Sequence, residues 1–213
     1  MQIKLQQVVP DFLEPEKISK SQIWNVPVDF ANKENVQIVA PSGSGKTSLI
    51  HFLYGLRKDY TGSITYDNKN IAGFDAEEFS IYRQQYISIV FQDLRLFPEQ
   101  TVLQNLEIKR LLNPFHNESR IEVMANRLGI GNKLNKLCKT CSYGEQQRIA
   151  IIRSLQQPFD FLLLDEPFSH LDENNRKKAM ELMEEETAAR NAAIILADLK
   201  PIEYFNAAKT LYL

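Results

Sequence analysis

Residues 40–50 read APSGSGKTSLI, and they carry the strongest indication of the fold class. Gly43 and Gly45 let the backbone turn closely, so that successive N–H groups point inward. The apolar run 36–40 (VQIVA) before the loop predicts a buried strand, and 46–56 (KTSLIHFLYGL) after it predicts a helix. A glycine-rich loop between a strand and a helix predicts a binding site for phosphate groups.

The side chains of this loop have separate expected roles. Lys46 reaches the β- and γ-phosphates of a nucleotide, and the Thr47 hydroxyl binds Mg²⁺. Ala40 replaces the first glycine of the pattern G-x-x-x-x-G-K-[ST], which is acceptable where φ is negative. The alternative, a Gly/Ser loop that ends in Lys-Thr by chance, is disfavoured by the strand and helix around it. The predicted nucleotide-binding residues are Pro41, Ser42, Gly43, Ser44, Gly45, Lys46, Thr47 and Ser48.

The composition limits what the rest of the chain can be. With 213 residues, 44% of them hydrophobic and 24% charged, the chain is expected to form one soluble domain. The net charge of -2 includes no basic excess, so no nucleic-acid partner is expected. No apolar run is long enough for a membrane span or a secretory leader, which favours a cytoplasmic protein. Cys138 and Cys141 are expected to be reduced thiols, because no second ligand pair stands at a zinc spacing.

Short apolar runs alternate with helical patterns along the chain. This alternation predicts an α/β fold with a parallel sheet and right-handed crossovers. From about residue 99 to 156 the pattern is almost wholly helical, which predicts a helical subdomain inserted into a single domain of residues 1–213. The expected strands are 36–40, 62–67, 86–91, 159–165, 192–197 and 209–213, and the expected helices include 46–56 and 173–190.

Two acidic residues, Asp165 and Glu166, follow the apolar run FLLL. Asp165 is therefore expected at the carboxyl end of a buried strand, the edge at which open α/β sheets bind ligands. There its carboxylate can hold Mg²⁺, and Glu166 can orient or deprotonate an attacking water. The alternative is a pair of turn-forming residues before Pro167, and the phosphate loop disfavours it.

Residues 141–155, CSYGEQQRIAIIRSL, predict a capped helix. Ser142 is expected as its N-cap, and Glu145 three residues later completes a capping box. Ile149, Ile152 and Leu155 are expected on the buried side. By itself this pattern indicates only a well-capped helix whose N-terminus suits an anion.

Together these motifs resemble the nucleotide-binding domain of ABC (ATP-binding cassette) ATPases over nearly the whole chain. APSGSGKTSL resembles their Walker A motif, FLLLDEP their Walker B motif, and CSYGEQQR their signature. VFQDLRLFP resembles their Q-loop, and SHLD (169–172) their D-loop. The resemblance is greatest to the ATPase subunits of the lipoprotein-release, macrolide-export and cell-division group. It implies a P-loop NTPase (RecA-like) core with a parallel sheet, an N-terminal β-subdomain and an inserted helical subdomain.

The resemblance also implies an activity and partners. The cofactors are ATP and Mg²⁺, with Glu166 and Gln92 as catalytic residues and Thr47, Gln92 and Asp165 as metal ligands. Two cassettes, as a homodimer or a heterodimer, close on the nucleotide, so that Ser142, Gly144 and Glu145 contact the ATP of the other subunit. An integral-membrane permease is the expected partner, and the cytoplasmic face of the inner membrane the expected location.

Aromatic and apolar residues outside these motifs leave alternatives open. An aromatic side chain is expected to stack on adenine. Phe12 is the first candidate and Trp24 the second, and either can instead be a core residue. Leu94, Leu96 and Phe97 form either part of the groove for the permease or ordinary packing of the helical region.

Three departures from the family pattern affect the expected activity. Tyr143 replaces the first signature glycine, Ala197 replaces the switch histidine, and the chain ends at Leu213, where relatives usually continue. Because the histidine would donate to the γ-phosphate, slow ATP hydrolysis is expected. The alternative is a degenerate ATP-binding regulatory module with little or no hydrolysis. A soluble ABC protein of DNA repair or translation, or a small nucleotide kinase, fits the motifs less well.

Overall fold

Two β-sheets form the framework of the protein in the computed structural model, which describes residues 1–213. The smaller, antiparallel sheet has the order β2-β1-β4-β5. Its strands are β1 (Ile3–Pro10), β2 (Val28–Phe30), β4 (Tyr60–Tyr66) and β5 (Lys69–Asn70). The larger sheet is parallel throughout and has the order β6-β7-β8-β3-β9. Its strands are β3 (Val36–Val39), β6 (Ile87–Val90), β7 (Phe161–Asp165), β8 (Ala193–Asp198) and β9 (Lys209–Tyr212).

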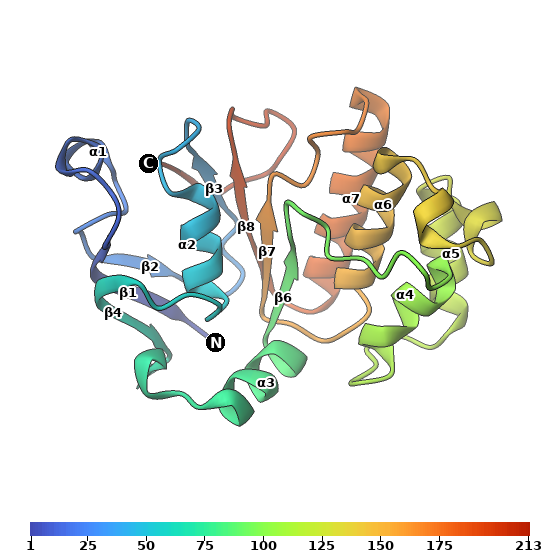
Figure 1. The fold of residues 1–213 in the computed structure, drawn as a ribbon, viewed down its shortest axis with the longest axis horizontal. Helices are drawn as coiled ribbons and strands as arrows, with labels where there is room; N and C mark the ends of the chain where they lie inside the picture. The colour runs from blue at the N-terminus through green and yellow to red at the C-terminus, as the bar shows by residue number, and fades with distance from the viewer.

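Helices cover both faces of the parallel sheet (Figure 1). Helix α2 lies between the two sheets, and α6 and α7 cover the opposite face, with α4 and α5 outside them. The helices are α1 (Pro15–Lys20), α2 (Lys46–Leu53), α3 (Ala76–Gln85), α4 (Val102–Arg110), α5 (Ser119–Arg127), α6 (Tyr143–Ser154) and α7 (Glu173–Ala189). Not one of them is both long and apolar enough to cross a bilayer.

The buried strands explain why the sheet is covered on both faces. All five residues of β7 are buried, and their side chains alternate between two hydrophobic cores. Phe161 and Leu163 pack on the side of α2 and the antiparallel sheet, whereas Leu162 and Leu164 pack on the side of α6 and α7. A continuous apolar run is the expected sequence of such a strand. The carboxyl ends of β3, β6, β7 and β8 therefore meet at one edge.

Helix α2 ends three residues earlier than the sequence pattern predicted. Its last residue is Leu53, and Gly55 follows with a φ of 69°. A Cβ atom at Gly55 would lie 2.1 Å from the Phe79 ring of α3, so the turn needs glycine for both its backbone and its packing. The turn leads the chain back to β4 and the antiparallel sheet.

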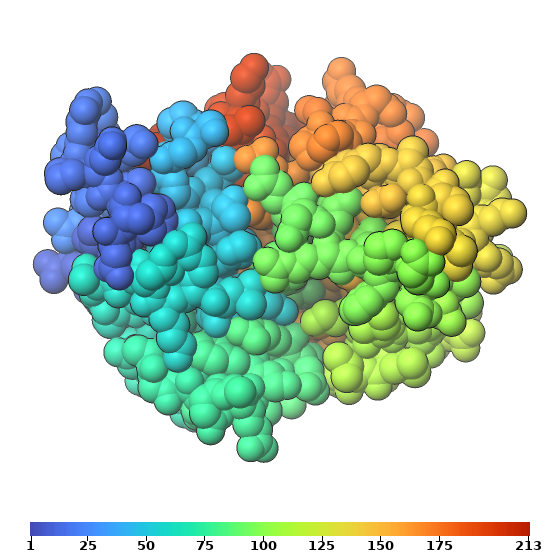
Figure 2. All heavy atoms as spheres, in the orientation of Figure 1, coloured from blue at the N-terminus to red at the C-terminus, as the bar shows by residue number.

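The segment between β6 and β7 contains α4, α5, α6 and two short 3-10 helices, at Gly131–Lys133 and Cys138–Thr140. Its only β-pairing is an isolated bridge between Thr101 and Leu137. The space-filling view shows this segment, green to yellow, as the side of the molecule opposite the blue N-terminal residues (Figure 2). The capping box of Ser142 and Glu145 is confirmed at the start of α6. The buried positions Ile149, Ile152 and Leu155 are confirmed as well.

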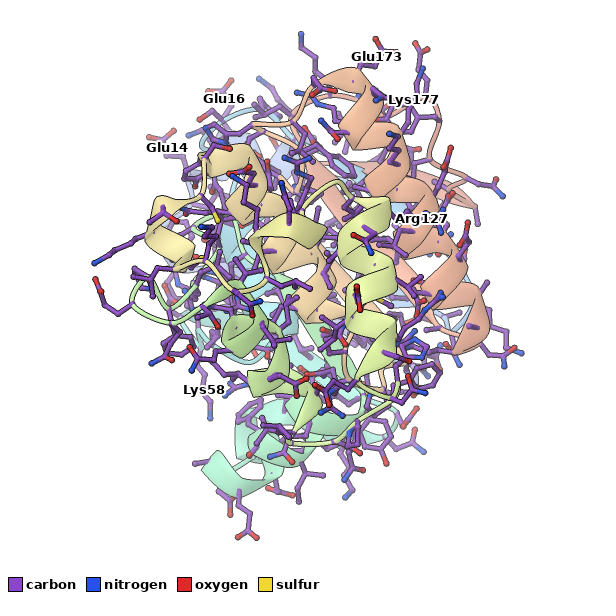
Figure 3. The ribbon with its side chains drawn as sticks, turned by 90° about the vertical axis from the view of Figure 1, so that its right-hand side faces the viewer. Glu14, Glu16, Lys58, Arg127, Glu173 and Lys177 are labelled. Carbon is purple, nitrogen blue, oxygen red and sulfur yellow. The ribbon has the colours of Figure 1, made fainter.

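Ion pairs connect α5 to α7. Arg127 of α5 donates to Glu185 of α7, with 2.7 Å between Nη2 and Oε1 (Figure 3). Deeper in the same interface, Glu186 of α7 accepts from Arg190 at 2.7 Å and from Arg120 at 2.8 Å. Its carboxylate also lies 2.6 Å from Nε2 of His116. Burial opposes ionisation of Glu186, but these hydrogen bonds outweigh it and lower its pKa to about 2.

Acid is expected to weaken this interface. A carboxyl group whose pKa is lowered by folding stabilises the protein above its unfolded pKa, and this contribution is lost as the pH falls toward the folded value. We therefore expect Glu186 to contribute about 3 kcal/mol at neutral pH and to lose it between pH 4.5 and about 2. Urea unfolding of the wild type and of Glu186→Gln across this range measures the difference.

The matched control for this experiment is Glu122→Gln, at an exposed position on α5. Glu186→Gln is expected to lower stability at pH 7 and to flatten the acid dependence, whereas the control changes neither. A Glu186→Gln variant with an unchanged acid dependence would show that this carboxylate does not couple to folding.

Candidate nucleotide-binding site

The phosphate loop connects β3 to α2 at the carboxyl edge of the parallel sheet. Gly43 and Gly45 have φ values of 76° and 95°, a region that favours glycine, and Gly45 is the N-cap of α2. Ala40 is not among the residues with positive φ, so alanine is accommodated there. Its N–H donates to the carbonyl of Asp198 at 3.0 Å, which ties the loop to the end of β8.

Trp24 supports this loop from below. Its indole Nε1 donates to the carbonyl of Ser44 at 3.1 Å. A Cβ atom at Gly45 would lie 3.1 Å from the indole ring, so the loop passes directly over it. Because Trp24 is only 1% exposed, the hypothesis that it stacks on adenine is wrong, and the core alternative is correct.

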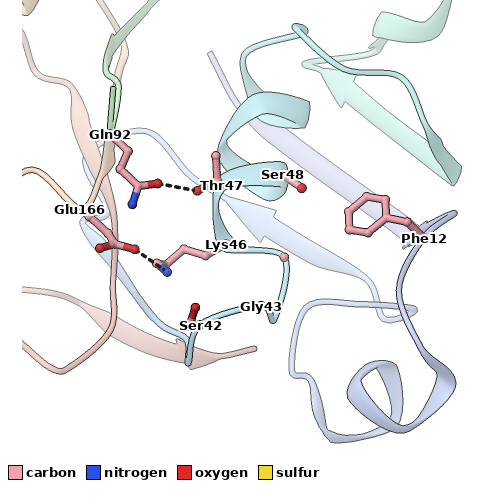
Figure 4. A pocket seen from close by; sticks show the side chains of 9 residues that line it. Phe12, Ser42, Gly43, Lys46, Thr47, Ser48, Gln92 and Glu166 are labelled. Atoms are coloured by element: carbon pink, nitrogen blue, oxygen red, sulfur yellow. Dashed lines mark hydrogen bonds and ion pairs between the residues drawn. The ribbon is translucent and has the colours of Figure 1, made fainter. Parts of the chain in front are cut away.

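A cavity of about 260 Å³ opens in front of the loop (Figure 4). Phe12 is 51% exposed and forms the wall farthest from the sheet edge. Pro41 lies outside the lining, and Ser44 turns its hydroxyl back to the carbonyl of Pro41 at 2.8 Å. The lining residues are Phe12, Ser42, Gly43, Gly45, Lys46, Thr47, Ser48, Gln92 and Glu166.

Lys46 and Glu166 form an ion pair inside this cavity, with 2.7 Å between Nζ and Oε1. Glu166 has a φ of 46°, an uncommon conformation for a residue with a side chain. The backbone N–H and the carbonyl of Glu166 both form hydrogen bonds. Its N–H donates to the carbonyl of Ala197 at 2.9 Å, and its carbonyl accepts from Nε2 of Gln147 at 3.4 Å. The chain therefore fixes this carboxylate beside the phosphate loop.

Three oxygen-bearing side chains lie together where a metal ion is expected. Oγ1 of Thr47 is 3.2 Å from Oε1 of Gln92, and both residues line a further cavity of about 370 Å³ with Asp165. Both carboxylate oxygens of Asp165 are buried without a hydrogen-bond partner. Burial raises the pKa of this carboxyl to about 6. Mg²⁺ prefers hydroxyl, amide and carboxylate oxygens, so the donor set fits this ion.

Ser142, Gly144 and Glu145 line neither of these two cavities, whereas Tyr143 of the signature lines the second one. Ser142 and Glu145 cap α6, with 2.7 Å between the Ser142 nitrogen and a Glu145 oxygen. Lys133 is paired with Glu145 at 3.2 Å. A Cβ atom at Gly144 would lie 2.9 Å from the carbonyl of His170, so the D-loop packs against the signature here. The contact of these residues with the nucleotide of another subunit stays a prediction.

Tyr143 connects the signature to two other loops. Its ring centroid lies 4.1 Å from that of His170, and its hydroxyl is 3.5 Å from the carbonyl oxygen of Gln92. Oγ of Ser169 is 2.8 Å from Nδ1 of His170 and holds the imidazole. The side chain that departs from the signature pattern therefore touches both the D-loop and the Q-loop.

Gln147 is a site residue that the sequence reasoning missed. It lies on the buried side of α6 and is 1% exposed. Its Oε1 accepts from the N–H of His170 at 3.0 Å, and its Nε2 donates to the carbonyl of Glu166 and to Oγ of Ser169. A polar residue within the buried stripe of a helix was the available signal, because such a side chain needs partners.

Ala197 occupies the position of the missing histidine. It is fully buried on β8 and pairs in register with Asp165 of β7. Partners in register on parallel strands point to the same face, so both side chains face the side of α2 and the phosphate loop. The methyl group offers no donor to a phosphate at this point.

The residues of the apolar cluster after Gln92 do not all support the same interpretation, a permease groove or ordinary packing. Leu94 is 3% exposed and belongs to the core, and Leu96 packs partly buried against it. Phe97 is 51% exposed and faces solvent. Packing therefore explains the two leucines but not Phe97.

The fold and this site define a nucleotide-binding protein of the P-loop class, with an acidic pair at the end of the neighbouring buried strand. Comparison with known sequences agrees, because the sequence model of the family described as ABC transporter matches residues 23–169. The chain belongs to the ABC transporter family as an ATP-binding cassette ATPase. The resemblance seen in the motifs and the α/β P-loop fold class are thereby confirmed.

Named relatives support the same assignment. "Lipoprotein-releasing system ATP-binding protein LolD 1" of Rhodopirellula baltica is 32% identical over 178 residues, which cover 82% of this chain and 78% of that protein. "Macrolide export ATP-binding/permease protein MacB" of Nitrosomonas europaea is 32% identical over 177 residues. That match covers 82% of this chain but only 27% of the length of the macrolide export protein.

Solved structures show the same fold. The dimeric structure of a bacterial ABC transporter cassette superposes with a TM-score of 0.79 at 25% identity, and covers 93% of this chain and 88% of that one. A second structure of that cassette, in a post-hydrolysis state with ADP and phosphate, gives a TM-score of 0.77 over 92% of this chain and 87% of that one, also at 25% identity.

Proposed function

We propose that this chain hydrolyses Mg·ATP as the cassette subunit of an ABC-type membrane transporter. One observation carries the proposal. The Glu166 carboxylate, at the end of β7, lies 2.7 Å from the ammonium of the phosphate-loop residue Lys46. A base for water and a cation for phosphate therefore face the same cavity, as an ATPase requires and a simple nucleotide-binding module does not.

The side chains divide the chemistry among them. The N–H groups of residues 42–47 and the ammonium of Lys46 bind the β- and γ-phosphates. Thr47, Gln92 and Asp165 hold Mg²⁺, which neutralises charge on the phosphates. Glu166 accepts a proton from the attacking water, and its backbone hydrogen bonds to Ala197 and Gln147 keep the carboxylate in place.

A second cassette is needed to complete the site. Ser142 and Gly144 stand at the N-terminus of α6, a 12-residue helix, and do not line the cavity of their own chain. The positive end of this helix suits the γ-phosphate of a partner. We infer a homodimer or a heterodimer with another cassette, and the bacterial cassette that superposes on this chain is itself dimeric. No nucleic acid takes part in this function.

A membrane partner follows from the same proposal. The two relatives carry transport names, a lipoprotein-releasing system and a macrolide export protein. We infer that this chain works with an integral-membrane permease, on the cytoplasmic face of the inner membrane. Phe97, exposed after the Q-loop, is a candidate contact for that permease.

A degenerate ATP-binding regulatory module is the second candidate function. Ala197 favours it, because one donor to the γ-phosphate is absent. Tyr143 favours it too, since its bulk stands at the signature and its hydroxyl reaches the Q-loop. Glu166 and its ion pair with Lys46 favour hydrolysis instead.

Phosphate release decides between these two functions. We expect the wild-type protein to release phosphate slowly from saturating ATP with Mg²⁺, and to release none with EDTA. The loss of one preorganised donor typically costs about 10²–10³-fold in rate, which leaves a slow enzyme rather than an inactive one. Binding of ATP without any Mg²⁺-dependent phosphate release would instead support the regulatory module.

A further inference from the structure

Phe12 stands at the far wall of the nucleotide cavity, across from the phosphate loop (Figure 4). It belongs to the loop that follows β1, and its ring is 51% exposed. The N–H of the preceding residue, Asp11, donates to the carbonyl of Asp59 at 3.1 Å. This bond joins the Phe12 loop to the loop between α2 and β4.

Arg57, in that second loop, covers one face of the Phe12 ring. The central carbon of its guanidinium lies 4.8 Å from the ring centroid, within the range of a cation–π contact. Arg57 does not line the cavity, whereas Phe12 does. The cation therefore covers part of the ring, and the half-exposed remainder of the ring is open to a flat group in the cavity.

Two residues fix the plane of this guanidinium. Asp59 accepts from Nε at 2.9 Å and from a terminal nitrogen as well, which is the bidentate geometry of a planar fork. The other terminal nitrogen donates to Oγ of Ser48 at 2.8 Å. Ser48 lies in the first turn of α2 and lines the cavity. Arg57 therefore links the aromatic wall to the helix that begins at the phosphate loop.

We propose that Arg57 is a positioning residue that holds the Phe12 ring at a fixed place and angle, so that the purine base of ATP stacks on its exposed part. This inference rests on the proposed function, because it concerns the nucleotide of the same site. Stacking of a base on an aromatic ring contributes about 1–3 kcal/mol. Without the Arg57 contact, the half-exposed Phe12 ring would be free to move, and part of this stacking free energy would be lost. Arg57 thus acts on the base and leaves the phosphates to Lys46.

If Arg57 only stabilised the fold, its substitution would change ligand binding in a different way. The side chains of Arg57 and Asp59 are 37% and 42% exposed, and exposed ion pairs contribute little to stability. A surface ion pair would affect ATP and inorganic triphosphate alike. A residue that positions the base affects only the ligand that has one.

The test compares two ligands with and without a base. Mg·ATP and magnesium triphosphate are titrated by calorimetry into the wild type, Arg57→Ala, Arg57→Lys and Phe12→Ala. We expect Arg57→Ala to weaken ATP binding by about 5–20-fold and triphosphate binding by less than about twofold. A lysine side chain keeps the charge without the planar fork, so the loss in Arg57→Lys is expected to lie between those of the wild type and Arg57→Ala. Arg110→Ala is the matched control, since Arg110 pairs with Glu107 on α4, outside the cavity.

A double-mutant cycle separates positioning from an independent effect. If Arg57 acts through Phe12, the double variant Arg57→Ala/Phe12→Ala is expected to bind ATP with the same affinity as Phe12→Ala alone. Additive losses, or an equal loss for both ligands, would overturn the inference and leave the proposed function intact. A wild type that binds neither ligand would overturn the proposed function, and the inference with it.

Discussion

Glu166→Gln is expected to reduce phosphate release by about 10²–10⁴-fold, the contribution of a positioned general base. Glutamine cannot accept the proton of the attacking water, whereas it retains the size of the side chain. The substitution also removes a negative charge that lies 2.7 Å from Nζ of Lys46, so ATP is expected to bind at least as tightly as before. Nucleotide should then remain trapped between two cassettes, and an ATP-dependent dimer should accumulate on gel filtration.

The control for this variant is Glu77→Gln, at an exposed position in the first turn of α3. It should release phosphate at the wild-type rate and form no additional dimer. Wild-type turnover in Glu166→Gln would remove this residue from the role of base. Loss of turnover without dimer formation at high ATP would argue against self-pairing and in favour of a different cassette as the natural partner.

Lys46→Ala is expected to abolish nucleotide binding, with a loss of affinity of at least about 100-fold. The Lys46 side chain is 6% exposed, and truncation of a buried charged partner costs about 2–5 kcal/mol. The substitution also leaves the Glu166 carboxylate without its cation, which would repel a phosphate group entering the cavity. Titration with a fluorescent ATP analogue measures the affinity directly.

Lys178→Ala, on the exposed side of α7, is the matched control for the lysine substitution. It removes the same charge from the chain and should bind the analogue like the wild type. Unchanged affinity in Lys46→Ala would contradict the assignment of this loop as the phosphate site. Circular dichroism of each variant shows whether a lost signal reflects a lost fold.

Elements that depend on chain neighbours were predictable. The capping box at the start of α6 requires only Ser142 and Glu145, three residues apart, and the structure contains it. The apolar run before Asp165 is long enough to indicate a strand covered on both faces, and β7 is such a strand. Both patterns reflect the geometry of residues that are close together in the chain, so they can be recognised in a single sequence.

Elements with weak patterns were not predictable. Helix α3 (Ala76–Gln85) has one buried residue, Phe79, so its sequence shows little amphipathic periodicity. Strand β2 has only three residues and depends on its pairing with β1. Both are stabilised by packing against partners distant in the chain, which a local pattern does not describe.

The phosphate loop, the acidic pair and the signature are each contiguous in the chain, so the class of the protein can be recognised without a structure. The residues that support the site could be identified only from the three-dimensional packing. It buried Trp24 under the loop, brought Gln147 to the Glu166 backbone, and laid Arg57 over Phe12. Such contacts depend on how sheets and helices pack, and each is specified by many residues at once. A buried polar group or an aromatic ring therefore acquires its role only when the fold brings its partner within reach.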